Sequence, residues 1–369
     1  MKKREKVLVA MSGGVDSSVT AALLKKKGYD LIGIYLNFWS DPTVFEQEDL
    51  AKFPQNKCCS LESQNHARQI AHDLDFPFYV LNVKDRFKKE IVDYFIDTYR
   101  MCKTPNPCVE CNRNIKFGFL LERMKQLGCD YIATGHFAKV KKKKDTISLY
   151  MGKDKIKDQS YFLYTLTQEK LKHVMFPVGN KTKAQVKKMA RKMGLKQIAE
   201  KKESQGVCFF PDKKHEDFLK RHFDESVLKE GPIITTDGEK IGTHKGLQFF
   251  TVGQRKGIEI GGEEKPWYVV RLDYDKNTLV VGKDEEIFQK EFIVNKFSFT
   301  EDELKDGEHK IDARIRYRFP PMKAKLIKKG DQGHIIFDKP QRAITPGQSV
   351  VFYKKTRVLG GGIIKEIVY

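Results

Sequence analysis

The chain has 369 residues, of which 40% are hydrophobic and 32% are charged, and Lys and Arg outnumber Asp and Glu by 69 to 49. This length exceeds the roughly 250–300 residues at which a single core stops growing, so we expect two or three domains, and the composition excludes a disordered or fibrous protein. The net charge of +20 favours a polyanionic partner such as nucleic acid, although lysines scattered over free surface positions would give the same excess.

The N-terminal stretch MKKREKVLVAMSGG is basic, but its apolar run is too short for a signal peptide. No segment reaches the roughly 18 apolar residues of a membrane span. We therefore expect a cytoplasmic protein without a membrane partner. Its seven cysteines would then be buried, catalytic or metal-bound rather than paired in structural disulfides.

Residues 1–135 alternate short apolar runs with helical patterns. The runs KVLVAM, DLIGIYL, FYVLNV and YIATG predict strands, and the segments 17–28, 60–74, 85–100 and 117–127 predict helices. This alternation indicates an α/β fold with a doubly wound parallel sheet. From residue 157 to about 195 the pattern is mostly helical, and KTKAQVKKMARKMG has a Thr cap at its start and a Gly at its end.

After about residue 211 the chain changes to glycine-rich turns and short alternating strands. TTDGEKIG predicts a hairpin with an Asp-Gly turn, KKKK at 141–144 is typical of a solvated hairpin tip, and the runs from about residue 271 onward predict a small closed β-barrel. Alternation in KIDARIRYRF would place Arg314, Arg316 and Arg318 on one strand face, as a strip for phosphates or merely an exposed face. We divide the chain into a nucleotide-binding catalytic domain at 1–210, a central domain at 211–272 and a β-barrel domain at 273–369.

A glycine-rich loop, SGGVDS, lies between the first predicted strand and the first predicted helix. Backbone amides and the helix dipole bind anions at such a junction, unless the turn only links strand to helix. It lacks the Walker Gly-Lys-Ser/Thr and is similar to the signature of the PP-loop ATP pyrophosphatases, which split ATP between its α- and β-phosphates. Asp16 is the expected carboxylate for Mg2+ or pyrophosphate, and ATGHFAK adds a second nucleotide cue at a strand end.

The stretch TPNPCVECN contains Cys108 and Cys111 between prolines that predict no regular helix. The spacing alone suits half of a metal site, a redox pair, or a nucleophile beside a bystander.

Eight motifs taken together resemble the bacterial and mitochondrial tRNA-specific 2-thiouridylases. They occur in order over nearly the whole chain: SGGVDS, TPNPCVECN, IKFG, ATGHFAK, KDQSYFLY, ESQGVCF, TVGQRKG and TPGQSVVFY. The resemblance implies ATP-dependent replacement of O2 by sulfur on the wobble uridine of the tRNAs for Lys, Glu and Gln. Because the uracil oxygen is a poor leaving group, ATP would first adenylate it, and a cysteine persulfide would then supply the sulfur.

The resemblance also implies roles for individual residues. Cys208 would carry the persulfide, and Cys111 would attack it or close a disulfide with it, from mobile loops at 103–112 and 203–210. ATP would be bound by Met11, Ser12, Gly13, Gly14, Val15, Asp16, Ser17, Ser18, Leu36 and Gly135. The target base and the rest of the tRNA would be contacted by Asn106, Pro107, Cys108, His136, Lys157, Asp158, Gln159, Arg316, Tyr317 and Gln348.

The chain departs from the family pattern at two of these positions. Leu36 stands where Met is more usual, and Cys108 stands where many relatives have Asp, which puts a proton-transfer role there in doubt. Cys108, Cys111 and Cys208 also suit an alternative mechanism in which three thiolates hold an iron–sulfur cluster.

Other cysteines and functions are secondary. Cys58 and Cys59 could be zinc ligands with His66 or His72, but we expect them to be structural, and Cys102 and Cys129 to lie in the core or at helix ends. A PP-loop synthetase for a small molecule would need no basic barrel, and a non-catalytic tRNA-binding protein would have lost Asp16 or Cys208. The expected partners are tRNA and a cysteine desulfurase or sulfur-carrier protein, with the enzyme itself a monomer.

Overall fold

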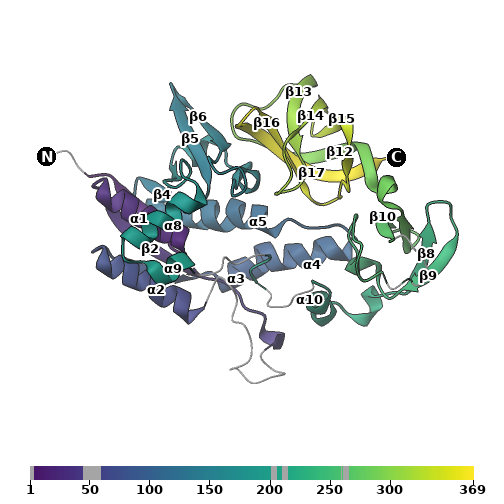
Figure 1. The fold of residues 1–369 in the computed structure, drawn as a ribbon, viewed down its shortest axis with the longest axis horizontal. Helices are drawn as coiled ribbons and strands as arrows, with labels where there is room; N and C mark the ends of the chain where they lie inside the picture. Colours follow the sequence, from purple (N-terminus) through teal and green to yellow (C-terminus); the bar gives the residue numbers. More distant parts are fainter. Residues whose placement is uncertain (1–3, 45–59, 201–205, 210–214, 259, 261–265) are drawn as a thin grey trace.

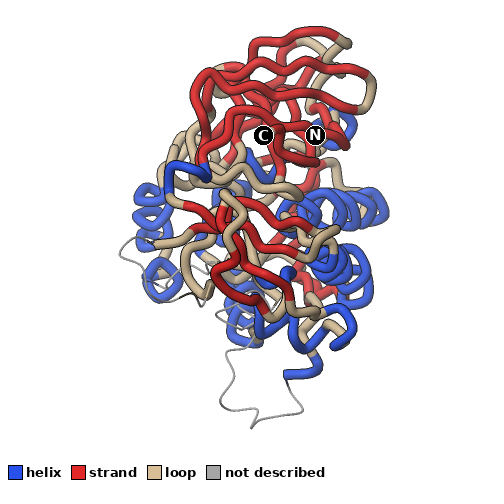
Figure 2. Tube along the Cα trace, turned by 90° about the vertical axis from the view of Figure 1, so that its right-hand side faces the viewer, coloured by secondary structure: helices blue, strands red, loops and turns tan. Residues whose placement is uncertain are grey.

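The computed structural model describes residues 4–44, 60–200, 206–209, 215–258, 260 and 266–369. Figure 1 shows an α/β part that begins at the N-terminus, a small sheet around β8 and β9, and a barrel formed by the C-terminal strands. Seen after a quarter turn, the barrel strands gather at the top of the molecule and the helices lie below them (Figure 2). Within the described residues, no helix is long and apolar enough to cross a membrane.

The α/β part is built on a five-stranded parallel sheet with the order β3-β2-β1-β4-β7. Its strands are β1 (Lys6–Ala10), β2 (Asp30–Asn37), β3 (Phe78–Asn82), β4 (Tyr131–Ala133) and β7 (Val174–Met175). The predicted doubly wound sheet is confirmed. Strand β7 was not predicted, because its two residues lie in a stretch with a mostly helical pattern.

Helices cover both faces of this sheet. Val7 and Val9 point into one core with α1 (Val15–Lys26), α2 (Leu61–Asp73), α8 (Lys183–Lys192) and α9 (Lys196–Glu200). Leu8 points into the other core, as the period-two alternation of a strand requires. The helical segments on that face are α3 (Lys84–Phe87), η2 (Lys88–Val92), α4 (Asp93–Arg100), η3 (Cys111–Phe119), α6 (Leu120–Gln126) and α7 (Gln168–Leu171).

The prediction that prolines keep TPNPCVECN out of a helix is wrong. Helix α5 (Pro107–Glu110) begins at Pro107 and continues into η3, a π-helical segment. Proline is tolerated at the first helical position, where its missing N–H has no intrahelical partner. Both cysteines of the motif are therefore held on helical turns, and the segment 107–112 is not the irregular loop that we expected.

The small sheet has the order β10-β11-β8-β9. It consists of β8 (Gly231–Thr235), β9 (Lys240–His244), β10 (Tyr268–Asp273) and β11 (Thr278–Gly282), and the predicted hairpin is the antiparallel pair of β8 and β9. The expected domain boundary at residue 272 falls within β10, and the division into three domains stays a prediction. Helix α10 (His215–His222) precedes this sheet.

The predicted closed barrel is confirmed. Its strands run in the order β12-β15-β14-β13-β16-β17, and pairing of β12 with β17 closes the ring. They are β12 (Phe288–Phe299), β13 (Gly307–Arg314), β14 (Met322–Lys329), β15 (Gln332–Arg342), β16 (Ser349–Lys354) and β17 (Arg357–Val368). The hairpin of β5 (Ala138–Lys143) and β6 (Thr146–Met151) leaves the α/β part and pairs with β17, and its lysine-rich tip is exposed.

The short 3-10 turns complete the described elements. They are η1 (Pro42–Val44), η4 (Ser160–Leu163), η5 (Glu225–Val227), η6 (Leu247–Phe249) and η7 (Asp284–Ile287).

Candidate active site

The phosphate loop is shaped by its own hydroxyl groups. The Ser12 N–H donates to Ser17 Oγ at 3.2 Å, and the hydroxyls of Ser17 and Ser18 each donate to the Gly14 carbonyl at 3.0 Å. Gly14 is the N-cap of α1, and no side chain caps that end of the helix. The first amides of α1 thus form an uncapped helix N-terminus, the arrangement that binds phosphate groups.

Two glycines allow this loop to pack tightly. Gly13 has a φ of +70°, and a Cβ atom there would lie 2.0 Å from the Ser63 carbonyl oxygen at the start of α2. A Cβ on Gly135 would lie 2.8 Å from the backbone carbon of Asp16. Helix α2 and the end of β4 therefore pack closely against the loop from two sides. A side chain at Gly13 or at Gly135 would prevent this packing.

A cavity of about 250 Å³ opens at the carboxyl ends of β1, β2 and β4. In an open parallel sheet this edge, where the strand order changes direction, is the usual ligand site. Six residues that the sequence predicts to bind ATP line the cavity: Met11, Ser12, Asp16, Ser17, Leu36 and Gly135. The predicted residues Gly13, Gly14, Val15 and Ser18 support the loop behind it.

A second cavity, of about 190 Å³, adjoins the first. Pro107 and Cys108 line it from α5, and Cys208 lines it from the segment 206–209. Phe209 holds that segment in place, because its ring is buried with centroids 5.2 Å from Phe95 and 5.9 Å from Phe87.

Five residues line both cavities and form what we call the shared wall: Cys111, Lys116, His136, Gln159 and Cys208. Of the described residues around the two cavities, Lys116 is the only Lys or Arg. Cys111 and Lys116 are five residues apart within η3, and the i to i+5 hydrogen bonding of a π-helix brings such residues toward one face. The shared wall thus combines two thiols, an ammonium, an imidazole and an amide.

The imidazole of the shared wall is neutral. Burial, and to a smaller extent the charge of Lys116, hold the pKa of His136 well below its usual value. Thr134 Oγ1 lies 2.7 Å from His136 Nδ1 and fixes the ring, while Gln159 Oε1 accepts a hydrogen bond from the Phe137 amide at 2.9 Å. Both polar groups are therefore oriented before any ligand enters.

The cysteines fall into two classes. Burial raises the pKa of Cys102 to about 12 and that of Cys129 to about 11, which makes both thiols poor nucleophiles at neutral pH. Cys108, Cys111 and Cys208 instead line the second cavity. Cys58 and Cys59 lie outside the described residues, so their predicted structural role stays a prediction.

The three cysteines of the second cavity do not form a metal site in the described structure. Within the ranges described, no three His, Cys, Asp or Glu side chains are grouped closely enough to hold a metal ion. The iron–sulfur alternative therefore stays a prediction.

Asp16 of the phosphate loop forms an ion pair that the sequence did not predict. Lys183 Nζ lies 2.8 and 2.7 Å from the two carboxylate oxygens of Asp16, across 167 residues of sequence. Lys183 is buried at the first position of α8, and its ammonium also lies 5.7 Å from the ring centroid of Phe137. This pair fixes the Asp16 carboxylate at the edge of the first cavity.

The segment that leads to α5 is held by hydrogen bonds from the barrel and from the central part of the chain. Gln348 Nε2 donates to the carbonyls of Thr104 (3.2 Å) and Pro105 (2.7 Å), and the Thr104 amide donates to the Pro346 carbonyl at 2.9 Å. The Thr104 hydroxyl also donates to Thr251 Oγ1 at 3.2 Å. The barrel therefore fixes the position at which the cysteine helix begins.

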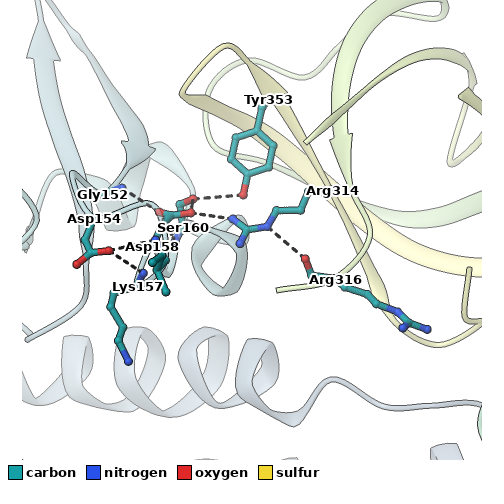
Figure 3. Close-up of polar contacts among 9 residues, drawn as sticks. Gly152, Asp154, Lys157, Asp158, Ser160, Arg314, Arg316 and Tyr353 are labelled. Carbon is teal, nitrogen blue, oxygen red and sulfur yellow. Dashed lines mark hydrogen bonds and ion pairs between the residues drawn. The ribbon is translucent and has the colours of Figure 1, made fainter. Parts of the chain in front are cut away.

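Asp158 forms a buried ion pair, and its predicted contact with the target base stays a prediction. It is fully buried, and Arg314, which is 4% exposed, donates to Asp158 Oδ2 at 2.8 Å. The Gly152 amide and the Ser160 amide and hydroxyl donate to the same carboxylate (Figure 3). This pair connects the α/β part to the barrel, and Lys157 points away from it (Figure 3).

The predicted strip of three guanidinium groups on one strand face is wrong. Strand β13 ends at Arg314, and Arg316 and Arg318 follow in a turn. Figure 3 shows the guanidinium groups of Arg314 and Arg316 pointing in opposite directions. Arg316 donates to the Ala343 carbonyl at 2.7 Å, and the Tyr317 ring packs 4.5 Å from that of Phe162.

The predicted Asn106 is 6% exposed, and its carbonyl accepts hydrogen bonds from the amides of Val109 and Glu110 at the start of α5. The sequence patterns missed the roles of Lys116 and Lys183, and they assigned Arg314 to a phosphate strip rather than to its ion pair with Asp158. IKFG contained Lys116, which lines the same two cavities as Cys111 from the π-helical segment.

Three family models match consecutive stretches of the chain. They are described as a tRNA methyl transferase HUP domain at residues 5–212, a tRNA methyl transferase PRC-barrel domain at residues 216–283 and an aminomethyltransferase beta-barrel domain at residues 289–364.

Full-length relatives carry a more specific name. Proteins named tRNA-specific 2-thiouridylase MnmA are 42% identical in Clostridioides difficile, with 99% of each chain covered, and 45% identical in Halothermothrix orenii, with 98% of this chain and 99% of that one covered. Among solved structures, a 4-thiouridine synthetase in complex with RNA and ATP matches with a TM-score of 0.35 and 17% identity, over 59% of this chain and 50% of that chain.

Proposed function

The chain belongs to the family of tRNA-specific 2-thiouridylases, as a tRNA-uridine 2-sulfurtransferase, and from this premise we propose how it exchanges oxygen for sulfur. ATP occupies the first cavity, the target uracil enters the second, and the reaction takes place at the shared wall. The observation that carries this proposal is that both cysteines expected to transfer sulfur, Cys111 and Cys208, line both cavities.

The first step adenylates the uracil. Its O2 attacks the α-phosphorus of ATP, the bond to pyrophosphate breaks, and the N3 proton is lost. The uncapped N-terminus of α1 binds the phosphates, and Asp16 would hold a magnesium ion that neutralises the departing pyrophosphate. Lys183 keeps the Asp16 carboxylate in place.

Lys116 supplies positive charge where the two cavities meet. The adenylate phosphate gains negative charge as AMP leaves, and of the described cavity residues Lys116 offers the only ammonium or guanidinium group there. A fixed cation at the position where charge develops is worth roughly 10²–10³ in rate. Neutral His136 and the oriented Gln159 amide are available to hydrogen-bond the uracil edge.

The second step transfers sulfur. The terminal sulfur of a Cys208 persulfide attacks C2, and AMP leaves, so that the uridine and Cys208 are joined by an S–S bond. The Cys111 thiolate attacks Cys208 Sγ, which releases 2-thiouridine and leaves a Cys111–Cys208 disulfide. A dithiol reductant returns this disulfide to two thiols. In an alternative order, the Cys111 thiolate first attacks Cys208 Sγ and releases sulfide from the persulfide, and this sulfide then attacks C2 of the adenylated uracil.

Further details of the proposal follow from the family. We propose the tRNAs for Lys, Glu and Gln as substrates, a cysteine desulfurase or sulfur-carrier protein as donor, and a monomeric enzyme in the cytoplasm. Leu36 would contact the adenine.

Nucleoside analysis of purified tRNA tests this function. Cells that lack the gene should lose 2-thiouridine at the wobble position of the three tRNAs, and the wild-type gene should restore it. A Cys208→Ser gene should not restore it, whereas Cys129→Ser, which removes a thiol outside the site, should. Unchanged 2-thiouridine in the deletion strain contradicts the proposal.

Iron content tests the cluster alternative. Protein purified without oxygen should be active and free of iron, and Cys108→Ser should keep most activity because Cys108 transfers no sulfur in the persulfide scheme. Loss of both iron and activity in Cys108→Ser would instead establish a cluster held by Cys108, Cys111 and Cys208.

A further inference from the structure

A third cavity, of about 320 Å³, lies where the three parts of the chain meet. Its walls come from the end of α4 (Met101 to Thr104), from β10 and the residue after it (Arg271 and Tyr274), and from the barrel (Thr345, Pro346, Lys365 and Tyr369). None of the described residues that line it lines the other two cavities. It is therefore a separate site, to which no role has been given.

We call this third cavity the junction cavity. Its charged side chains are predominantly basic. Lys103, Arg271 and Lys365 line it, and of the described lining residues only Glu366 has an acidic side chain. Glu366 lies 3.2 Å from Lys365 Nζ, an exposed contact that contributes little energy. The cavity thus suits an anionic ligand.

Exposed aromatic rings accompany these cations. Six large apolar or aromatic side chains of the described residues are more than half exposed, and three of them, Met101, Tyr274 and Tyr369, line this cavity. The Arg271 guanidinium lies 5.3 Å from the centroid of the Tyr369 ring. Rings and guanidinium planes beside cations are the surfaces on which unpaired RNA bases stack.

The junction cavity is also close to the cavity for the target base. Thr104 lines the former and Pro107 lines the latter, and three residues span at most about 11 Å. Hydrogen bonds from Gln348 and Thr104 to the backbone fix this connection. An RNA strand whose uridine enters the second cavity consequently brings a neighbouring nucleotide near the junction.

We propose that the junction cavity binds a nucleotide of the tRNA strand that flanks the thiolated uridine. The base packs on Tyr274, and the phosphate pairs with Lys103 and Arg271. This inference rests on tRNA as the substrate and is independent of the adenylation and persulfide steps.

Binding of unmodified tRNA in the absence of ATP tests the proposal, over a series of salt concentrations. Tyr274→Ala should weaken binding about tenfold, because stacking on one aromatic side chain is lost. Arg271→Gln should weaken binding and reduce the magnitude of the log–log salt slope by about 0.7, the value for one contact to a single-stranded phosphate.

Matched variants control for surface changes elsewhere. Tyr79, 52% exposed on β3, and Lys26, exposed at the end of α1, lie outside the cavity, so Tyr79→Ala and Lys26→Gln should leave affinity and slope unchanged. Thermal melting checks that each variant is folded. If a cavity variant melts at a lower temperature than the wild type, Lys365→Gln is tested in its place.

Two results would overturn the proposal. In one, the cavity variants bind tRNA as tightly as the controls, with the same salt slope. In the other, UMP binds the enzyme in an Arg271-dependent manner while tRNA binding is indifferent to Arg271→Gln, which would make this a site for a free nucleotide. Because no ATP or persulfide is present, failure here leaves the proposed mechanism untouched.

Discussion

The shared wall and the Asp158–Arg314 ion pair are both polar and both come from motifs that the sequence marks as functional, yet their surroundings differ. In the shared wall, Cys111, Lys116 and Cys208 line two cavities. In the Asp158–Arg314 ion pair, Asp158 is fully buried and both of its carboxylate oxygens accept hydrogen bonds from protein donors. Membership of a motif therefore does not distinguish a residue that lines a cavity from one that is buried in an ion pair.

The largest expected effect is the loss of stability when the Asp158–Arg314 ion pair is broken. Arg314→Met leaves the Asp158 carboxylate buried without its cation, and we expect the free energy of unfolding to fall by about 3–5 kcal/mol. Denaturant unfolding measures this, with Lys310→Met, an exposed position on the same strand, as a control that should change little. The comparison would break if Asp158→Asn weakened tRNA binding without any loss of stability.

The next effect is on the shared wall. Lys116→Met should lower the single-turnover rate of thiolation by about 10²–10³, because the charge at the departing AMP is no longer neutralised. Lys116→Arg should recover part of the rate, and Lys26→Met should behave as the wild type. If Lys116→Met instead lowered the free energy of unfolding enough to account for the loss of rate, Lys116 would have a structural role.

A third buried polar group makes stability depend on acid pH. Burial raises the pKa of Asp41, but hydrogen bonds from His222 and Thr43, the charge of His222 and a hydrogen bond from Arg221 outweigh it and lower the pKa from 3.8 to about 2. Since the folded pKa lies below the unfolded one, this stabilisation is complete above about pH 4 and disappears as the pH falls toward 2. It amounts to about 2 kcal/mol.

Unfolding measured between pH 2 and 5 tests this assignment. The wild type should lose stability more steeply toward low pH than Asp41→Asn, because the Asn variant has no carboxylate to protonate. Parallel curves for the two proteins would contradict it.

The smallest effect concerns Gln348, which contacts the cysteine segment in the structure but is predicted from the family to touch tRNA. Gln348→Ala removes its hydrogen bonds to Thr104 and Pro105, and we expect about a tenfold lower kcat with little change in KM. Gln332→Ala, at an exposed position of the barrel strand β15, is the control. A raised KM at unchanged kcat would show a direct tRNA contact instead.

Local patterns were sufficient to predict the phosphate loop and the parallel sheet. The SGGVDS loop lies between a strand and a helix, and the anion site at that junction depends only on neighbouring residues. The end of β4 followed from the same sheet, so Gly135 could be expected beside the loop, whereas Leu36 was expected from the family resemblance alone.

Long-range pairs could not be predicted in this way. Asp158 and Arg314 are 156 residues apart, and Asp16 and Lys183 are 167 apart, so no spacing in the sequence connects them. Pro107 misled the prediction because a proline that interrupts a helix in its interior is compatible with its first turn. Cys111 and Lys116 line the same two cavities from a segment with π-type hydrogen bonding, which the sequence pattern did not indicate.

The most direct test of the account is a single turnover of Cys208→Ser with tRNA and ATP labelled at the α-phosphate. If adenylation and sulfur transfer are separate steps at one wall, this variant should release pyrophosphate and accumulate label on the tRNA without forming 2-thiouridine. Wild-type enzyme loaded with persulfide should release the label as AMP with one 2-thiouridine for each AMP. The account would be contradicted if Cys208→Ser formed no labelled tRNA, or if it still formed 2-thiouridine.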